Sequence, residues 1–325
     1  MRAYFFRRLL ILIPTLFLVT LLIFFLIRLM PGDIVDSLQG QSIDVKLDRA
    51  TIERKLGLDA PAIILYGRWM GLTPQVDGSF SGILQGDLGI SWWQGTPVVQ
   101  LLAARWMVTL ELGILGLIIA QLIALPIGVY SALRQDTWGD YIGRSFAILC
   151  ISVPYFWVGT LVIVFPSIWW NYMPPLMLIP FTEDIIGNLR MFIVPALVLG
   201  MALGGMIMRM TRTMVLVVLR QDYIRTAWAK GLSERIVILR HALKNAAIPV
   251  ITLIGLQVPF VIGGTVIIEK IFSLPGMGRL ILDATLFRDQ PLISGIILLF
   301  SVVLMLINLL VDLTYAYLDP RIRYR

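Results

Sequence analysis

The sequence predicts an all-α membrane protein with six transmembrane helices, from its composition, its apolar runs and the placement of its basic residues. Of the 325 residues, 58% are hydrophobic and only 14% are charged, and the mean hydropathy is +0.86. A soluble domain carries about 25% charged residues, so this chain has too few of them to cover a globule in water. A bilayer supplies the apolar solvent that such a composition requires.

Six apolar stretches are long enough to cross a bilayer. A helix rises about 1.5 Å per residue, so about 20 residues span the hydrocarbon layer of about 30 Å. The expected spans are residues 9–30, 107–132, 142–169, 192 to between 208 and 219, 247–268 and 292–317. The first apolar run is too long for a signal peptide and no small-residue cleavage site follows it, so we expect a retained anchor.

The basic residues give the orientation, because cytoplasmic loops of membrane proteins are rich in Lys and Arg. Most of them gather between spans four and five, between spans two and three, and in the tail. They are Arg209, Arg212, Arg220, Arg225, Lys230, Arg235, Arg240 and Lys244, then Arg134 and Arg144, then Arg321, Arg323 and Arg325. This arrangement places both termini in the cytoplasm. The net charge of +7 is assigned to contact with anionic lipid headgroups rather than to nucleic acid.

The expected organisation is an N-terminal transmembrane helix at 1–30, an extracytoplasmic segment at 31–105, a five-helix core at 106–320 and a cytoplasmic tail at 321–325. Within the second segment, Ile43, Leu47, Ile52 and Leu56 recur near helical spacing. We expect short helices on the outer surface there, with a flexible loop as the alternative.

The cytoplasmic loop at 220–245 has the pattern of two helices joined by a sharp turn. Asp222 is the expected N-cap of a helix over 223–230, and Gly231 suits the left-handed conformation that ends a helix. Ser233 then suits the N-cap of the next helix. A short exposed helix of this kind can seat in a partner's groove or lie on anionic headgroups, and helix physics alone leaves both open.

The residues of this loop resemble the EAA loop of importer-type ABC permeases, in the variant of the peptide and nickel permease family. The matching run is Asp222, Tyr223, Ile224, Arg225, Thr226, Ala227, Trp228, Ala229, Lys230, Gly231 and Leu232. A second run, 241–246, reads H-A-L-K-N-A as that family does, although only Leu243 matches the I-x-L-P of the general importer motif. Similar motifs follow in order along most of the chain, among them 86–89, 109–113, 275–278 and 288–291.

The resemblance implies the type I ABC importer permease fold and a bacterial inner-membrane location. It also implies a second homologous permease, two cytoplasmic ATPases that use ATP and Mg, and an extracytoplasmic solute-binding protein. The helix 222–231 would couple to the ATPase, with Arg225 and Lys230 meeting acidic groups while Ala227 and Gly231 give clearance. On that expectation, Ala227→Glu blocks docking. Oligopeptides or dipeptides are the expected solutes, with nickel chelates or oligosaccharides as alternatives.

Two polar residues inside spans are candidates for the translocation path. Glu111 lies early in span two, on the outer side. There it either faces the solute, for example a peptide amine, or pairs with Arg105 at the interface. Gln257 in span five is the second candidate. Ionisable groups near span ends, namely Arg209, Arg212 and Asp312, are expected to snorkel or to pair across helices.

Enzymatic and metal chemistry find no support in the sequence. The chain has no G-x-x-x-x-G-K-[ST] loop, and we expect it to bind no cofactor of its own. Cys150 and His241 are its single cysteine and histidine, so no disulfide or zinc site is expected.

The competing interpretations are a secondary transporter or channel and a membrane scaffold, and a membrane-embedded enzyme is less well supported still. Dependence on nucleotide discriminates them, because only the ABC interpretation requires an ATPase.

Overall fold

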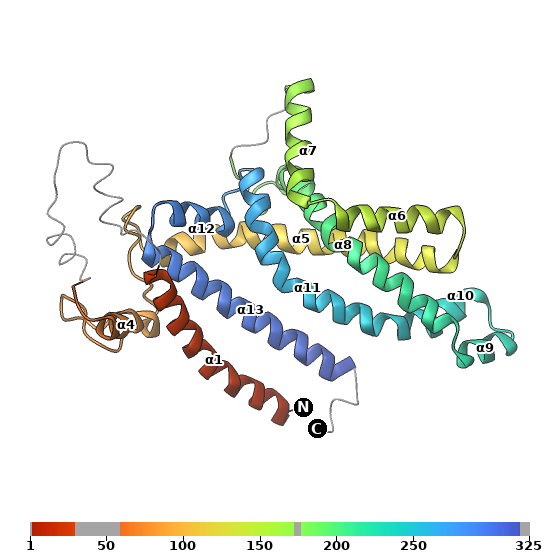
Figure 1. The fold of residues 1–325 in the computed structure, drawn as a ribbon, viewed down its shortest axis with the longest axis horizontal. Helices are drawn as coiled ribbons and strands as arrows, with labels where there is room; N and C mark the ends of the chain where they lie inside the picture. The colour runs from red at the N-terminus through yellow and green to blue at the C-terminus, as the bar shows by residue number, and fades with distance from the viewer. Residues whose placement is uncertain (1, 30–58, 172–176, 319–325) are drawn as a thin grey trace. The chain divides into compact units, whose positions relative to one another are not determined.

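The computed structural model describes residues 2–29, 59–171 and 177–318, and Figure 1 shows its ribbon. In these ranges the regular elements are helices, with an isolated β-bridge between Ile90 and Pro97. The predicted all-α class is therefore confirmed. The chain forms two compact units, the first comprising Met1–Met107 with Arg279–Leu306 and the second Val108–Gly278 with Ile307–Arg325.

Five helices of the described chain are long and apolar enough to cross a membrane. They are α1 (Arg2–Arg28), α5 (Val98–Leu133), α8 (Ile185–Leu219), α11 (Leu243–Ile271) with the short helical segments before it, and α13 (Gln290–Leu318). They coincide with predicted spans one, two, four, five and six. At 36 and 35 residues, α5 and α8 are each about 50 Å long. Both therefore extend beyond the hydrocarbon layer.

The third predicted span, residues 142–169, is wrong as a single straight helix. Instead α6 (Trp138–Ser152) and α7 (Tyr155–Trp170) are bent by 93° at a short break, and Figure 1 shows α7 pointing away from α6. The break lies at Pro154, whose ring disfavours helical backbone in the residue before it and which has no N–H to donate. Val153 accordingly has extended backbone angles, φ −88° and ψ 122°. Together the two helices meet the length and hydropathy requirement for a broken span or a re-entrant pair.

Small residues hold α5 and α8 together inside the second unit. A Cβ added to Gly200 would lie 2.8 Å from the carbonyl oxygen of Gly116 and 3.1 Å from the Ala120 nitrogen. One turn further on, Gly204 faces Ala120 at van der Waals distance. Such residues let helix backbones approach closely in membranes. The buried core around this contact includes Phe192, which has no exposed surface.

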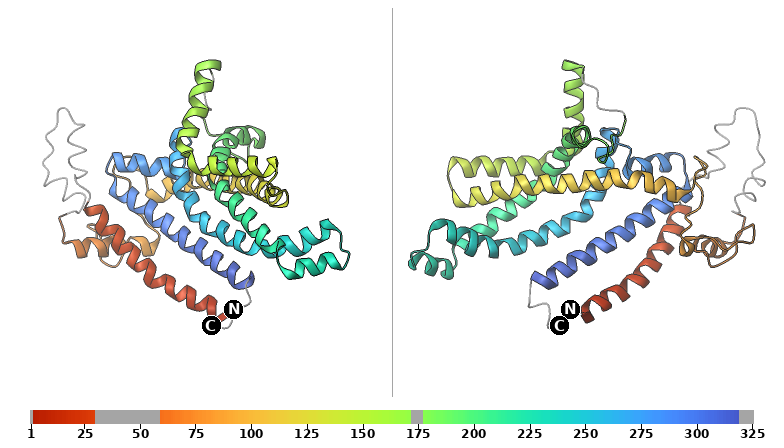
Figure 2. Two further views of the ribbon diagram at one scale, coloured as in Figure 1. Left: turned by 45° about the vertical axis from the view of Figure 1, so that its right-hand side comes forward. Right: turned by 180° about the vertical axis from the view of Figure 1, so that it is seen from behind.

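Helix α11 joins the same core through only one of its two adjacent glycines. A Cβ on Gly264 would lie 2.9 Å from a methyl group of Leu199, whereas Gly263 has nothing within 4 Å. Of the two glycines, only Gly264 therefore allows a close contact with α8. Figure 2 shows α8 and α11 running beside each other toward one end of the second unit.

The first unit is tied together by a buried carboxylate, Asp289, which lies just before α13. It accepts hydrogen bonds from the Ser91 hydroxyl and from the backbone N–H groups of Trp92 and Trp93, both at 3.2 Å. It also caps α13 by accepting from Leu292 N at 3.3 Å. The 288–291 motif thus has a structural explanation: it anchors the 91–93 loop to the start of α13.

The segment 31–105 contains two short helices in its described part, α4 (Ala62–Met70) and η1 (Ile83–Gln85). Helix α4 begins after Pro61 and ends at Gly71, whose φ of +80° is left-handed. Its Tyr66 packs beside Phe24 of α1, and its hydroxyl lies 2.9 Å from the Thr20 hydroxyl. The helix expected from the spacing of Ile43, Leu47, Ile52 and Leu56 lies outside the described residues.

The α5–α8 contact gives a stability prediction. Gly200→Ala forces a Cβ against the backbone of α5, and overpacking of this kind costs about 1–3 kcal/mol. We expect the variant to lower the thermal unfolding temperature of the purified protein. Gly263→Ala is the control: its Cβ meets nothing within 4 Å, so helix propensity should leave stability equal or raise it by up to about 1 kcal/mol. Equal unfolding temperatures for the two variants would contradict the contact.

Candidate functional site

The loop that was predicted to couple forms a short helix, α9 (Asp222–Ala229), directly after α8. The N-cap is Gln221 rather than Asp222, so the predicted cap is wrong by one residue. Asp222 is instead the first helical residue, where its negative charge still favours the positive end of the helix dipole. Arg225 pairs with it at 3.4 Å on the exposed surface, a contact of the kind that contributes little to stability.

The inner face of α9 packs on the helical segment that follows it. Ile224 and Ala227 are 1% and 6% exposed, and they form one cluster with Val237 and Ala242. The clearance role expected for Ala227 is therefore wrong, because its methyl group is buried inside the loop. A larger residue there would disturb the loop itself before it met any partner.

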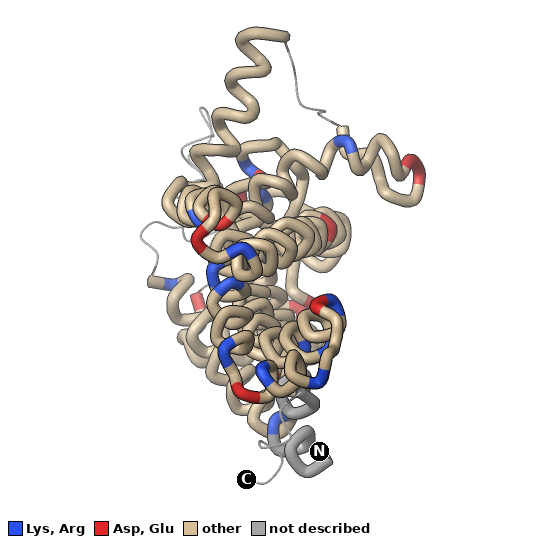
Figure 3. The backbone as a smooth tube through the Cα atoms, turned by 90° about the vertical axis from the view of Figure 1, so that its right-hand side faces the viewer, with Lys and Arg blue, Asp and Glu red and all other residues tan. Residues whose placement is uncertain are grey.

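The outer face of α9 remains open in this chain. Tyr223 and Trp228 are 42% and 45% exposed, and Arg225, Thr226 and Ala229 are exposed beside them. The Tyr223 hydroxyl accepts a hydrogen bond of 2.9 Å from Asn245 Nδ2 at the start of α11. Figure 3, which looks toward this end of the second unit, shows many Lys and Arg residues around few acidic ones. The loop thus presents a cationic surface with two aromatic side chains.

Gly231 forms the predicted elbow after α9. Its φ is +76°, a left-handed conformation that other residues rarely adopt, and its N–H donates to the Trp228 carbonyl at 2.9 Å. Ser233 is the residue before α10 (Glu234–Ile236), as predicted, although its side chain makes no capping hydrogen bond. A π-helical segment, η2 (Val237–Ala242), then leads into α11. Such segments are rare and occur frequently at functional sites.

The two candidate path residues lie on different helices of the second unit. Glu111 is half-buried on α5, where the Asn188 side chain of α8 lies within hydrogen-bonding reach of its carboxylate. Gln257 is buried on α11, where its Nε2 donates to the Leu203 carbonyl at 3.2 Å while its Oε1 has no partner in the described chain. The structure does not bring Glu111 and Gln257 together in a described contact. Gln257 therefore keeps an acceptor atom available.

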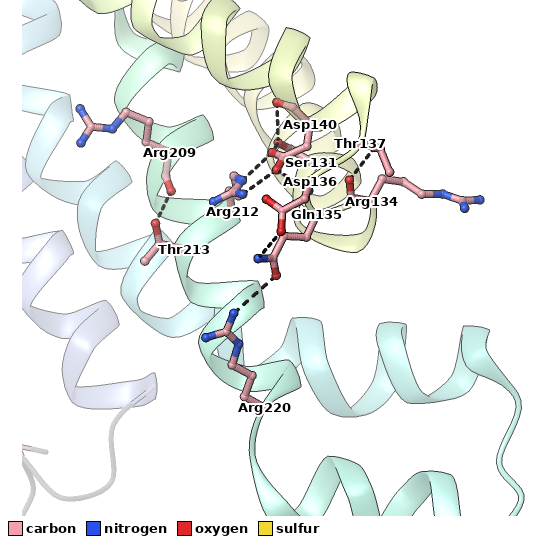
Figure 4. A network of polar contacts seen from close by, with 10 residues as sticks. All are labelled: Ser131, Arg134, Gln135, Asp136, Thr137, Asp140, Arg209, Arg212, Thr213 and Arg220. Atoms are coloured by element: carbon pink, nitrogen blue, oxygen red, sulfur yellow. Dashed lines mark hydrogen bonds and ion pairs between the residues drawn. The ribbon is translucent and has the colours of Figure 1, made fainter.

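Two buried carboxylates were not foreseen from the sequence as sites. Asp140 on α6 forms a two-pronged ion pair with Arg212 of α8 (Figure 4). Glu269, near the end of α11, accepts from the Thr109 hydroxyl at 2.6 Å and from Gly278 N at 2.7 Å. The signal for both was an acidic residue within or beside an apolar run, which is costly unless it is paired. The pairing expected across helices is confirmed for Arg212.

Glu269 explains the glycines of the 275–278 motif. A Cβ on Gly276 would lie within 2.5 Å of the Glu269 carboxylate atoms, and one on Gly278 would lie 2.3 Å from the Val266 Cα. The turn therefore wraps the carboxylate too closely for side chains. Thr109 links the carboxylate to this turn, because its hydroxyl donates to Glu269 and also accepts a hydrogen bond from Met277 N at 2.8 Å. This motif and the start of the 109–113 motif thus meet at one structural site.

Solved structures identify the fold of the chain. The chain resembles an amino acid ABC transporter crystallised with histidines, at a TM-score of 0.53 and 14% identity, covering 67% of this chain and 94% of that one. It also resembles the MetNI methionine ABC transporter in an inward-facing conformation, at 0.53 and 15%, covering 68% and 97%. At these identities the likeness shows the fold alone. That fold is the one found in ABC importer permeases.

The chain belongs to the family described as the binding-protein-dependent transport system inner membrane component, which matches residues 124–324, and the N-terminal component of that description matches residues 1–113. Relatives include the glutathione transport system permease protein GsiC of Salmonella paratyphi A (38% identical), Pectobacterium atrosepticum (39%) and Escherichia coli K12 (38%). Each match covers 325 residues and 100% of both chains. The chain is thus a multi-pass permease subunit of an ABC importer, and separate subunits carry ATP hydrolysis.

The packing of α9 predicts different effects for two neighbouring alanines. Ala227→Glu places a carboxylate in the cluster with Val237 and Ala242, so we expect the loop to open and trypsin to cut faster at its basic residues. Ala229→Glu adds the same side chain on the exposed surface and should leave the cleavage rate near that of the parent. Limited proteolysis of the purified chain measures both. Equal rates for the two variants would contradict the inward orientation of Ala227.

Proposed function

We propose that this chain imports peptide-type solutes, forming the pathway with a second homologous permease and coupling through α9 to two cytoplasmic ATPases. In this proposal both termini lie in the cytoplasm and an extracytoplasmic binding protein delivers the solute. The basic loops between α5 and α6 and between α8 and α11 support this orientation, because positive charge is retained on the cytoplasmic side.

The observation that carries the proposal is the construction of α9. One face is fixed against Val237 and Ala242, and the Tyr223–Asn245 hydrogen bond braces the other side to α11. A helix held in this way presents Trp228, Arg225 and Lys230 outward without first having to be ordered, which lowers the cost of binding. The exposed cations suit an acidic cleft, and the aromatic side chain suits a pocket within it.

The solute class rests on the relatives. The three GsiC proteins are named for transport of glutathione, which is a small peptide, and their similarity extends over the full chain. Peptides are therefore the first solutes to test, glutathione among them. Nickel chelates and oligosaccharides are the alternatives, and a competition assay with unlabelled solutes separates the three.

Glu111 and Gln257 are the proposed polar contacts of the path. Buried acceptor atoms without a donor are costly, at about 1–3 kcal/mol each. An amide N–H of the solute would relieve that cost at Gln257, and a solute ammonium would pair with the Glu111 carboxylate. The two residues therefore suit a ligand that carries donors along its length, as a peptide does.

Docking through the outer face of α9 can be tested at Ala229. Ala229→Glu should release the ATPase from the purified complex and abolish uptake, because a carboxylate there opposes the proposed acidic cleft. Ala229→Ser preserves the small size and should retain both. Co-purification from native membranes in mild detergent, together with labelled-solute uptake, provides the measurement. Full uptake by inserted Ala229→Glu protein would exclude this docking face, and uptake without any ATPase would favour a secondary transporter.

The path can be tested at Glu111 with matched solutes. If its carboxylate binds the peptide amine, Glu111→Gln should raise KM about ten-fold, the equivalent of losing one charge-assisted hydrogen bond, for a peptide with a free amino terminus. The N-acetylated form of the same peptide should show the same KM for parent and variant. An equal change for both peptides would assign Glu111 a structural role.

A further inference from the structure

A buried ion pair with its hydrogen bonds joins α5, α6 and α8, about two helical turns before α8 ends. The Asp140 side chain has no exposed surface and that of Arg212 is 19% exposed. Arg212 Nε and Nη2 donate to the two carboxylate oxygens at 2.7 and 2.6 Å. The Ser131 hydroxyl at the end of α5 donates to the same carboxylate, and Asp136 N donates to it from the connecting turn at 3.1 Å. The carboxylate of α6 thus holds α5, the turn and α8 at one point (Figure 4).

The same turn also contacts Arg220, the first residue of the coupling loop at 220–245. Arg220, the C-cap of α8, donates through Nη2 to Gln135 Oε1 at 3.5 Å. One residue, Gln221, separates Arg220 from the start of α9. Between the two polar contacts, Ala132 of α5, Val215 of α8 and Ala246 of α11 form one buried cluster. The connection between α5 and α6 is therefore bonded to both ends of the last two helical turns of α8, through Arg212 and Arg220.

Close backbone packing leaves this end of α8 little freedom to slide. A Cβ on Gly128 would lie 2.7 Å from the Thr211 Cβ and 2.8 Å from the Met208 carbonyl oxygen. Two-pronged arginine–carboxylate bonds fix orientation as well as distance. A displacement of α9 that reaches α8 must therefore move α5 and α6 with it or break a buried charge pair.

We propose that Asp140 and Arg212 are positioning residues of the transport cycle, transmitting movement of α9 to α5 and α6. This rests on the proposed function, in which α9 binds the ATPase. The pair touches neither solute nor ATPase: it acts by keeping the end of α8 in a fixed place relative to the α5–α6 turn. Loss of the two-pronged geometry should leave docking intact but uncouple hydrolysis from uptake.

The first experiment compares Arg212→Lys with the parent in the intact complex reconstituted in liposomes. Lysine keeps the buried charge but replaces the two-pronged bond with a point contact. We expect the ATPase to remain bound, and solute imported per ATP hydrolysed to fall about five-fold, within the range that mutations along coupled networks produce. Arg209→Lys is the matched control, because Arg209 is exposed on the same helix and points away from Asp140 in Figure 4. It should leave the ratio unchanged.

A second readout reports position rather than activity. In a Cys150→Ala background, Trp138→Cys and Gln221→Cys place spin labels on exposed residues at the start of α6 and at the N-cap of α9. The distance distribution between them should be narrow in the parent and broader with Arg212→Lys. Ser131→Ala removes one hydrogen bond to the carboxylate and should give a smaller change in the same direction, so it serves if the lysine variant fails to assemble.

Three results would overturn the proposal. One is an unchanged ratio of uptake to hydrolysis in Arg212→Lys. Another is a loss of uptake that only follows the amount of assembled complex, which would mean a folding role alone. The third is an unchanged distance distribution in Arg212→Lys or Ser131→Ala. A parent preparation that holds no ATPase would instead refute the proposed function, and the distance measurement would still test the pair.

Discussion

The contact between α5 and α8 is the interaction on which the second unit depends. Helices in lipid gain little from hydrophobic burial against one another, so close van der Waals contact between backbones has to supply the association. The glycines at 116 and 200 provide it at the middle of the helices. Gly128 continues the same approach toward the C-terminal ends of α5 and α8. Side chains on α8 thereby reach α5 and α6 at fixed distances, and the Asp140–Arg212 geometry follows from that closeness.

Helices α8 and α11 hold the proposed coupling loop as a rigid extension of themselves rather than on a flexible connection. Leu219 ends α8 and, after two residues, α9 begins, so little chain is left to absorb movement. Burial of Ile224 against Val237 then fixes the short helix to the segment that enters α11. An eight-residue helix would be marginal in water by itself. Its order comes from tertiary packing. A helix that is ordered in this way can pass a displacement on to the helices that hold it.

Hydropathy predicted the spans well, because the bilayer imposes a minimum apolar length that the sequence displays directly. It failed at Pro154, since an apolar run is equally compatible with a straight span and with two bent helices. The glycine elbow at Gly231 was predictable from backbone sterics alone. The inward orientation of Ala227 was not, because the partner of each face of α9 depends on residues 237–242 folding back beside it. Asp140 was missed for the same reason: its importance lies in Arg212, which is far away in sequence.

In the part of the chain that the structure describes, some polar groups in the core of the second unit keep an unpaired oxygen. The side-chain oxygens of Asn188 and Gln257 are buried without a donor among the described residues, although each loses hydration in that position. Asn188 already donates to the Ile179 carbonyl, and Gln257 donates to that of Leu203, so both amides are oriented with their oxygens free. Orientation by one hydrogen bond that leaves an acceptor open differs from a satisfied structural contact. It prepares the site for a donor from another molecule, whether water, a partner chain or a solute. A permease whose solute is only transiently present must bear this cost between transport events.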